Sequence, residues 1–287
     1  MAASLIEDFN GQNTSIAAIE RELVRLRETS TVPGESANMR TSVMTHCAWV
    51  PPRWLDAAEA ALAGLAERHP SRTIILVPLP DEPSGLDAEL SLRCFASGER
   101  HVCTEVIELR LRGDRVQAPA SIVLPLLISD LPVFCRWRGE PAFGEAPWEQ
   151  LTDVADRVIV DSSEWEELRY DELCQAFDRA AISDIAWARL LDWRVELAGR
   201  WPEIREQEIR VSGPHADAML LRGWLASRLG RAIRPVEEAP ELAVRLGGED
   251  VRPPRAEHPS PSDLLSAELD RFTRDRVYEE AALAAVA

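Results

Sequence analysis

The chain of 287 residues contains no lysine, and all of its 32 basic residues are arginine. Lysine-dependent chemistry, such as a Schiff base, a lysine general base or a phosphate-loop lysine, is therefore excluded. The sequence also lacks the dinucleotide fingerprint GxGxxG, the nucleophile elbow GxSxG, the HExxH motif and paired-cysteine zinc spacings. Only five histidines occur, and they are scattered. These absences predict a protein that is not an enzyme and that holds no metal and no cofactor.

Long apolar runs and positive charge are also missing. No run of eighteen apolar residues occurs, so we expect no membrane span. The opening MAASLIEDFNGQN has no basic stretch followed by an apolar core, so we expect no signal peptide. The net charge of −17 is the opposite of the basic footprint of nucleic-acid-binding proteins. We therefore expect a cytoplasmic protein that binds neither nucleic acid nor membranes.

Cysteine is scarce, with five residues and no CxxC pair, as is usual in a reducing compartment. A hairpin centred between Gly98 and Glu99 would place Cys94 opposite Cys103 on adjacent strands. This pairing leaves open a redox or metal role together with His101. We interpret the pair instead as two thiols in a strand pair, and we expect neither a disulfide nor zinc.

What the sequence does contain is enough apolar residue, 46%, to build a core. Apolar runs at 71–80, 132–137 and 156–162 are typical of strands buried on both faces. Segments 89–96 and 102–112 alternate in polarity around SGER, which predicts an antiparallel hairpin. Helical spacing between the strands predicts an α/β fold, with a mostly parallel sheet, this hairpin and flanking helices. The helices expected in the first half are 13–28, 53–67, 118–131 (interrupted at Pro125) and 163–180, and a further strand is expected at 40–49.

The second half is more helical. Capping residues and apolar spacing predict helices at 184–198, 215–229, 262–272 and 275–286, and strands at 206–212 and 242–247. We predict three parts: an N-terminal helix and linker (1–39), an N-terminal α/β domain (40–165) and a smaller, helix-rich C-terminal α/β domain (166–287).

The segment RHPSR joins a predicted helix to a buried strand. Its residues Arg68, Ser71 and Arg72 are a candidate site for a phosphate or carboxylate, because arginine forks match such anions. The alternative is that Arg68 complements the end of the helix, which Pro70 terminates.

A second candidate is the loop after strand 132–137. It brings together Trp137, Arg138, Phe143 and Trp148. Sites collect at the carboxyl ends of parallel strands, and aromatic residues with arginine are typical of interface hot spots. We predict a partner interface here, and the alternative is that the tryptophans cover the core.

Several longer segments occur in a characteristic order. They are RHPSR, HVCTEVIEL, SIVLPLLISDLPVFCRWRGEP, ADRVIVDSSEW, ISDIAWARLLDWR, LLRGWLASRLG and the tail LLSAELDRFTRDRVYEEA. In these segments the chain resembles the glucose-6-phosphate dehydrogenase assembly proteins, the OpcA family. The resemblance runs from about residue 40 to residue 230 and resumes in the tail.

The resemblance implies a non-catalytic protein that binds glucose-6-phosphate dehydrogenase and promotes its assembly or allosteric activation. Such a partner would serve the oxidative pentose phosphate pathway and its supply of NADPH. It implies no catalytic residues. The alternative from a different class is a sugar-phosphate-binding enzyme or metabolite sensor that uses the Arg68/Arg72 region.

We predict that the purified chain alone turns over neither glucose 6-phosphate nor NADP, because it lacks a nucleotide fingerprint and lysine. The measurement is NADPH formation by protein freed of contaminating dehydrogenase. Turnover that survives this purification would show that the protein is an enzyme.

Overall fold

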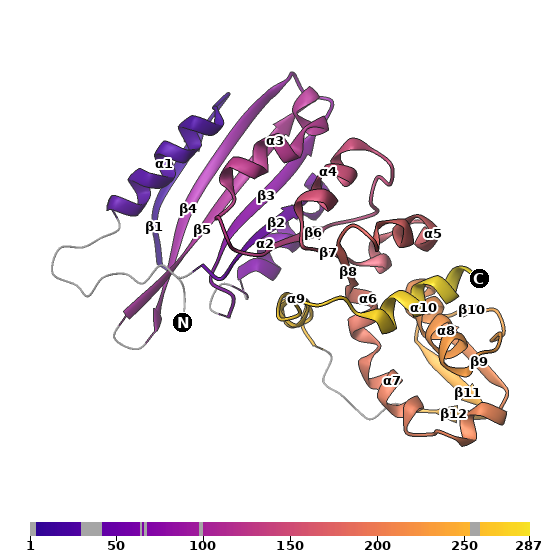
Figure 1. Ribbon diagram of the computed structural model, residues 1–287. Helices are drawn as coiled ribbons and strands as arrows, with labels where there is room; N and C mark the ends of the chain where they lie inside the picture. Colours follow the sequence, from indigo (N-terminus) through magenta and orange to yellow (C-terminus); the bar gives the residue numbers. More distant parts are fainter. Residues whose placement is uncertain (1–3, 30–41, 64, 66–67, 98–99, 253–258) are drawn as a thin grey trace. The chain divides into compact units, whose positions relative to one another are not determined.

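The computed structural model describes residues 4–29, 42–63, 65, 68–97, 100–252 and 259–287 (Figure 1). The chain forms two compact units, residues 1–158 and 159–287. The predicted division at residues 39 and 165 stays a prediction.

The larger sheet has eight strands. They are β1 (Ser4–Gly11), β2 (Met44–Trp49), β3 (Ser71–Leu79), β4 (Gly85–Ser97), β5 (Arg100–Arg112), β6 (Val133–Trp137), β7 (Arg157–Val160) and β8 (Ala181–Asp184). Their order is β1-β4-β5-β3-β2-β6-β7-β8. Strand β2 pairs in parallel with β3 and β6, β3 pairs in parallel with β5, and β4 pairs antiparallel with β1 and β5. The predicted mostly parallel sheet with one antiparallel hairpin is confirmed.

The central strands follow from their composition. From residue 74 onward strand β3 is a continuous apolar run, and all of the strand's residues except Leu79 are buried, as expected for a strand covered on both faces. The hairpin register is also as predicted, with Cys94 opposite Cys103. The side chains of these two cysteines lie outside the described residues.

Strand β1 was not predicted, because SLIEDFNG has no sustained alternation of polarity. It is an edge strand that pairs antiparallel with β4, with an irregularity between Leu5 and Asp8. The open edge of the long strand β4, rather than local propensity, decides its conformation.

The helices of the first unit flank this sheet. They are α1 (Ile16–Thr29), α2 (Leu55–Ala63), α3 (Pro119–Val123) and α4 (Ala146–Val154). On α1, the residues Ile19, Leu23 and Leu26, which share one face at helical spacing, are buried. Helix α3 gives way to a 3-10 turn that contains Pro125, which confirms the predicted interruption.

The second unit contains a four-stranded sheet in the order β10-β9-β11-β12. Its elements are α5 (Tyr170–Leu173), α6 (Ile185–Arg189), α7 (Leu191–Ala198), β9 (Ile209–Gly213), α8 (His215–Leu229), β10 (Glu237–Glu238), β11 (Ala243–Leu246), β12 (Glu249–Val251), α9 (Pro261–Leu269) and α10 (Arg276–Val286). Helix α8 has the predicted bounds and ends at Gly230, whose positive φ of 63° forms a left-handed cap. Within the described ranges, no helix is long and apolar enough to cross a membrane.

Two predictions for this region were wrong. The helix expected at 163–180 reduces to α5 and short 3-10 turns, and the buried strand β8 follows it. The helix expected at 184–198 divides into α6 and α7 at Leu190. The four residues of β8 are too few to show a period, so its pairing in the sheet could not be read locally.

Helices α8 and α10 lie side by side in Figure 1, and Gly223 sets their separation. A Cβ atom on Gly223 would lie 2.1 Å from the carbonyl oxygen of Ala281 and 2.8 Å from the nitrogen of Ala285. Both contacts are with backbone, which cannot rotate away. The two helices therefore need glycine at this position.

We expect Gly223→Ala to lower the free energy of unfolding by about 2–3 kcal/mol, because α10 must move away from α8. Thermal and urea unfolding measure the change. The matched control is Gly199→Ala, where the nearest atom lies 3.4 Å from the added Cβ and no positive φ is required. Equal stability of the two variants would contradict the close packing.

Candidate functional site

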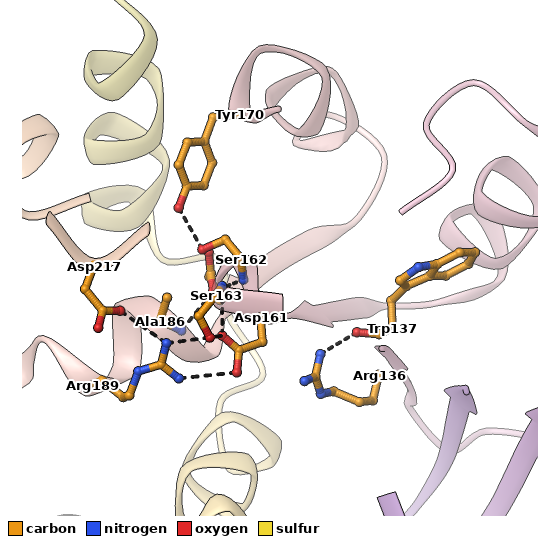
Figure 2. A network of polar contacts seen from close by, with 10 residues as sticks. Arg136, Trp137, Asp161, Ser162, Ser163, Tyr170, Ala186, Arg189 and Asp217 are labelled. Carbon is orange, nitrogen blue, oxygen red and sulfur yellow. Dashed lines mark hydrogen bonds and ion pairs between the residues drawn. The ribbon is translucent and has the colours of Figure 1, made fainter. Parts of the chain in front are cut away.

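The densest polar network in Figure 2 is built where strands β7 and β8 end. Asp161 follows β7 and Asp184 is the last residue of β8. The Asp184 carboxylate accepts hydrogen bonds from the backbone N–H of Ser162, at 3.1 Å, and of Ala186, at 2.9 Å. The second bond caps α6 at its N-terminus. These bonds bring the carboxyl ends of the two strands together, and in parallel sheets ligands bind at this edge.

Arg189 joins three segments of the second unit. Its guanidinium donates to both carboxylate oxygens of Asp161, at 3.3 Å each, and to Asp217 on α8 at 3.1 Å. Burial alone would lower the pKa of Arg189, but the two carboxylates outweigh burial and raise it. Burial also raises the pKa of Asp217, although the charge of Arg189 opposes this rise. The result is an arginine that remains charged and holds α6 to α8.

The two serines of this network are occupied by neighbouring groups. Ser163 donates its hydroxyl to Asp161 at 2.6 Å, and Tyr170 donates its hydroxyl to Ser162 at 2.7 Å. Burial raises the pKa of Tyr170 well above its ordinary value. A serine nucleophile needs an adjacent general base, and a buried neutral tyrosine does not supply one. The contact of Ser162 with Tyr170 is thus structural, and the hydroxyl of Ser163 is held by Asp161.

Asp184 is completely buried, and burial, with the nearby charge of Asp161, raises its pKa to about 7. Its second carboxylate oxygen has no hydrogen-bond partner among the described residues. The buried hydroxyl of Tyr278 also has no hydrogen-bond partner among the described residues. Burial, together with the charge of Asp184, raises the pKa of Tyr278. A perturbed acid is a common sign of a functional site, but a side chain without solvent access cannot reach a substrate in this conformation.

The three residues of the predicted anion site differ in their surroundings. Arg72 is buried, donating from Nε to Glu105 at 2.8 Å and from a terminal nitrogen to the Leu126 carbonyl at 2.6 Å. Ser71, also buried, lies within 3.3 Å of the Thr73 hydroxyl. Because Ser71 and Arg72 are consecutive in β3, their side chains leave opposite faces of the sheet. Arg68 is exposed.

The predicted interface loop is partly buried. Trp137 and Trp148 are each only 2% exposed. Trp137 stacks on Trp49 with ring centroids 5.0 Å apart, and Trp148 meets the edges of Trp137 and Phe143 at 5.3 and 5.1 Å. Both tryptophans therefore lie in the core of the first unit, as the alternative interpretation held.

Arg138 and Phe143 are the two members of this group that remain half-exposed. The guanidinium of Arg138 lies over the ring of Trp54, 4.7 Å from its centroid. The interface prediction is thus confined to these two side chains and stays a prediction.

Sequence reasoning missed the network around Arg189. Its members come from four separate segments, and each has an ordinary local role as a cap or a charged helix residue. The one local signal was the capping position of Asp184. Only the pairing of β8 could have brought it to Ser162.

Comparison with known proteins bears on both units. Residues 63–175 match a family model described as the glucose-6-phosphate dehydrogenase subunit N-terminal domain, and residues 180–253 match the corresponding C-terminal domain. The chain belongs to the OpcA family. Its polar network draws Asp161 and Tyr170 from the first matched range and Asp184, Arg189 and Asp217 from the second.

Relatives with curated names come from cyanobacteria and are provisionally named OxPP cycle protein OpcA. The protein of Synechocystis sp. is 30% identical over 181 residues, and that of Nostoc punctiforme is 32% identical over 184 residues. A third, from Synechococcus elongatus, is 29% identical over 184 residues. Each alignment covers 58% of this chain but only 38% to 41% of the relative, so the chain matches less than half of these proteins.

We expect Asp184→Asn to gain stability relative to the wild type as the pH rises. The ordinary aspartate pKa is 3.8 and the folded value is about 7. Between these values the folded chain holds a proton that the unfolded chain has lost, so rising pH destabilises the wild type by up to about 4 kcal/mol. Asparagine keeps an oxygen for Ser162 and Ala186 but does not titrate.

Urea unfolding of both proteins from pH 4 to pH 8 measures this difference. Other titrating groups are common to both and cancel. The exposed Asp171→Asn, the same substitution outside this network, is the matched control. A flat difference for Asp184→Asn would mean that the folded-state pKa is not raised.

Proposed function

We propose that this protein is a non-catalytic partner that binds glucose-6-phosphate dehydrogenase and promotes its assembly or allosteric activation in the cytoplasm. One observation carries this proposal. Residues 63–175 and 180–253 match family models that are described as the two domains of a glucose-6-phosphate dehydrogenase subunit. The names of the cyanobacterial relatives support a role in the same oxidative pathway.

The network at the ends of β7 and β8 supports a role without catalysis. Its serines are engaged by Asp161 and Tyr170, and its perturbed acid, Asp184, is sealed from solvent. The sequence also lacks lysine and nucleotide fingerprints. Such a protein acts on its partner's equilibrium and takes no part in the chemical step.

Activation by binding requires differential affinity. The protein must bind the active conformer or oligomer of the dehydrogenase more tightly than the inactive one. A coupling free energy of about 1–3 kcal/mol corresponds to changes of roughly 5–150-fold. By reciprocity, ligands that favour the active dehydrogenase would tighten its binding to this chain.

We place one contact for the dehydrogenase at Arg138 and Phe143. Both are half-exposed, and both rest on aromatic rings, Arg138 on the half-buried Trp54 and Phe143 on the buried Trp148. A side chain held in this way loses little conformational freedom on binding, which lowers the entropic cost of association. Arginine and aromatic anchors of this kind dominate the energy of many interfaces.

The first experiment is co-purification with the dehydrogenase from the same organism, followed by light scattering and an activity assay. We expect a stable complex, a change in dehydrogenase oligomer or activity when this chain is added, and no turnover by the chain alone. A dehydrogenase whose activity, assembly and elution are unaffected by this chain would refute the proposal.

Substitutions at Arg138 and Phe143 test whether these side chains contact the dehydrogenase. We expect Phe143→Ala and Arg138→Ala to lower activation at least about tenfold, which corresponds to about 1.4 kcal/mol of binding free energy. Folding stability should fall by about 1–2 kcal/mol for Phe143→Ala, since the ring is partly buried against Trp148. Activation titrations and thermal unfolding measure the two effects.

The matched control is Phe272→Ala, the same substitution at a phenylalanine that is 64% exposed in the second unit. It should leave activation unchanged. A large loss of stability in Phe143→Ala with undiminished activation would show that this loop only covers the core.

A further inference from the structure

The second unit contains a cavity of about 400 Å³ on the open face of its four-stranded sheet. One face of this sheet, formed by Ile209, Val211, Val244, Leu246 and Val251, is buried. Because side chains alternate, the intervening residues of β9 and β11 leave the opposite face. Trp193 of α7 forms a wall of the cavity above that face.

The strand register explains the hollow. Ser212 lies opposite Ala243, and these two small side chains form part of the lining between larger neighbours. In the next row, Arg210 lies directly opposite Arg245, which in turn faces Asp250 on β12. Arg252, two residues after Asp250, also lines the cavity. Small side chains therefore form the floor of the cavity, and the guanidinium groups of the three arginines and the indole of Trp193 form its rim.

The charge at this cavity differs from that of the whole chain. Three arginines line it against two carboxylates, those of Glu237 and Asp250, whereas the chain carries a net charge of −17. Like charges placed directly opposite on adjacent strands are destabilising, so the Arg210–Arg245 pair is unfavourable unless anions lie near it.

The arginines remain available to a ligand. Arg245 pairs with Asp250 at 2.6 Å and Arg210 pairs with Glu208 at 2.9 Å, but all four side chains are about half-exposed or more. Exposed pairs of this kind contribute little to stability. A doubly charged phosphate competes well for such forks, because it accepts bidentate, charge-assisted hydrogen bonds.

We propose that this cavity binds a small phosphorylated metabolite. Arg245 and Arg252, with Arg210 beside them, hold the phosphate, and the rest of the ligand packs its ring on Trp193. The volume lies within the range of small-molecule sites. This site is separate from the Arg68/Arg72 region, and it does not depend on the binding of glucose-6-phosphate dehydrogenase.

The test is calorimetric titration of the full chain, without dehydrogenase, with inorganic phosphate, glucose 6-phosphate and AMP. We expect saturable binding of all three, with at least one ring-bearing probe about tenfold or more tighter than phosphate. Tighter binding of glucose 6-phosphate would identify the ligand as a sugar phosphate, and tighter binding of AMP would identify it as a nucleotide. Absence of saturable binding for all three, or equal affinity for all three, overturns the proposal.

Four variants complete the experiment, each checked for an unchanged melting temperature. Arg245→Ala and Arg252→Ala should weaken every probe about tenfold or more. Ala243→Leu fills the hollow without changing charge and should abolish the preference for the ring-bearing probe. The control Arg228→Ala removes an arginine that pairs with Glu280 and does not line the cavity, and it should bind as the wild type does. Wild-type affinity in the three cavity variants overturns the proposal.

Discussion

The buried carboxylate of Asp184 is the constraint on which the second unit depends. It accepts backbone hydrogen bonds from Ser162 and Ala186, so it fixes the end of β8, the start of α6 and the chain that leaves β7. Burying a carboxylate away from solvent is costly unless hydrogen bonds or a counter-charge compensate. The hydrogen bonds from Ser162 and Ala186 offset only part of the free energy lost on burying the carboxylate. The pKa of Asp184 therefore stays raised.

The neighbouring ion triplet of Asp161, Arg189 and Asp217 shows how the chain uses arginine, which supplies all of its 32 Lys/Arg-type charges. Arginine is better suited than lysine to buried ion pairs, because its planar fork meets two carboxylates at once and is weakly hydrated. Arg72 plays the same part in the first unit, where it joins Glu105 to the carbonyl of Leu126. A composition without lysine, which excludes much catalytic chemistry, is thus compatible with ion pairs inside the protein.

The tertiary structure relocates the candidate binding surfaces. Tryptophans that looked like interface anchors lie in the aromatic core, where Trp137 stacks on Trp49. They serve the surface indirectly, since Phe143 rests on Trp148 and Arg138 rests on Trp54. The arginines that could meet an anion lie on the open face of the smaller sheet, and Arg72 does not contribute. Both surfaces suit the binding roles proposed above.

The sequence by itself determined the family, the α/β class, the β4–β5 hairpin with its Cys94–Cys103 register, and helix α8 to the residue. These features are local: apolar runs mark buried strands, hairpin pairing follows from the turn, and a proline start with a glycine end bounds a helix. Strands β1 and β8 were decided by tertiary structure, because each is stabilised by a neighbouring strand that is distant in sequence. Tertiary structure also forms the Arg189 network and the cavity beside Trp193. Their side chains come from separate segments, and they contact one another only after the chain has folded.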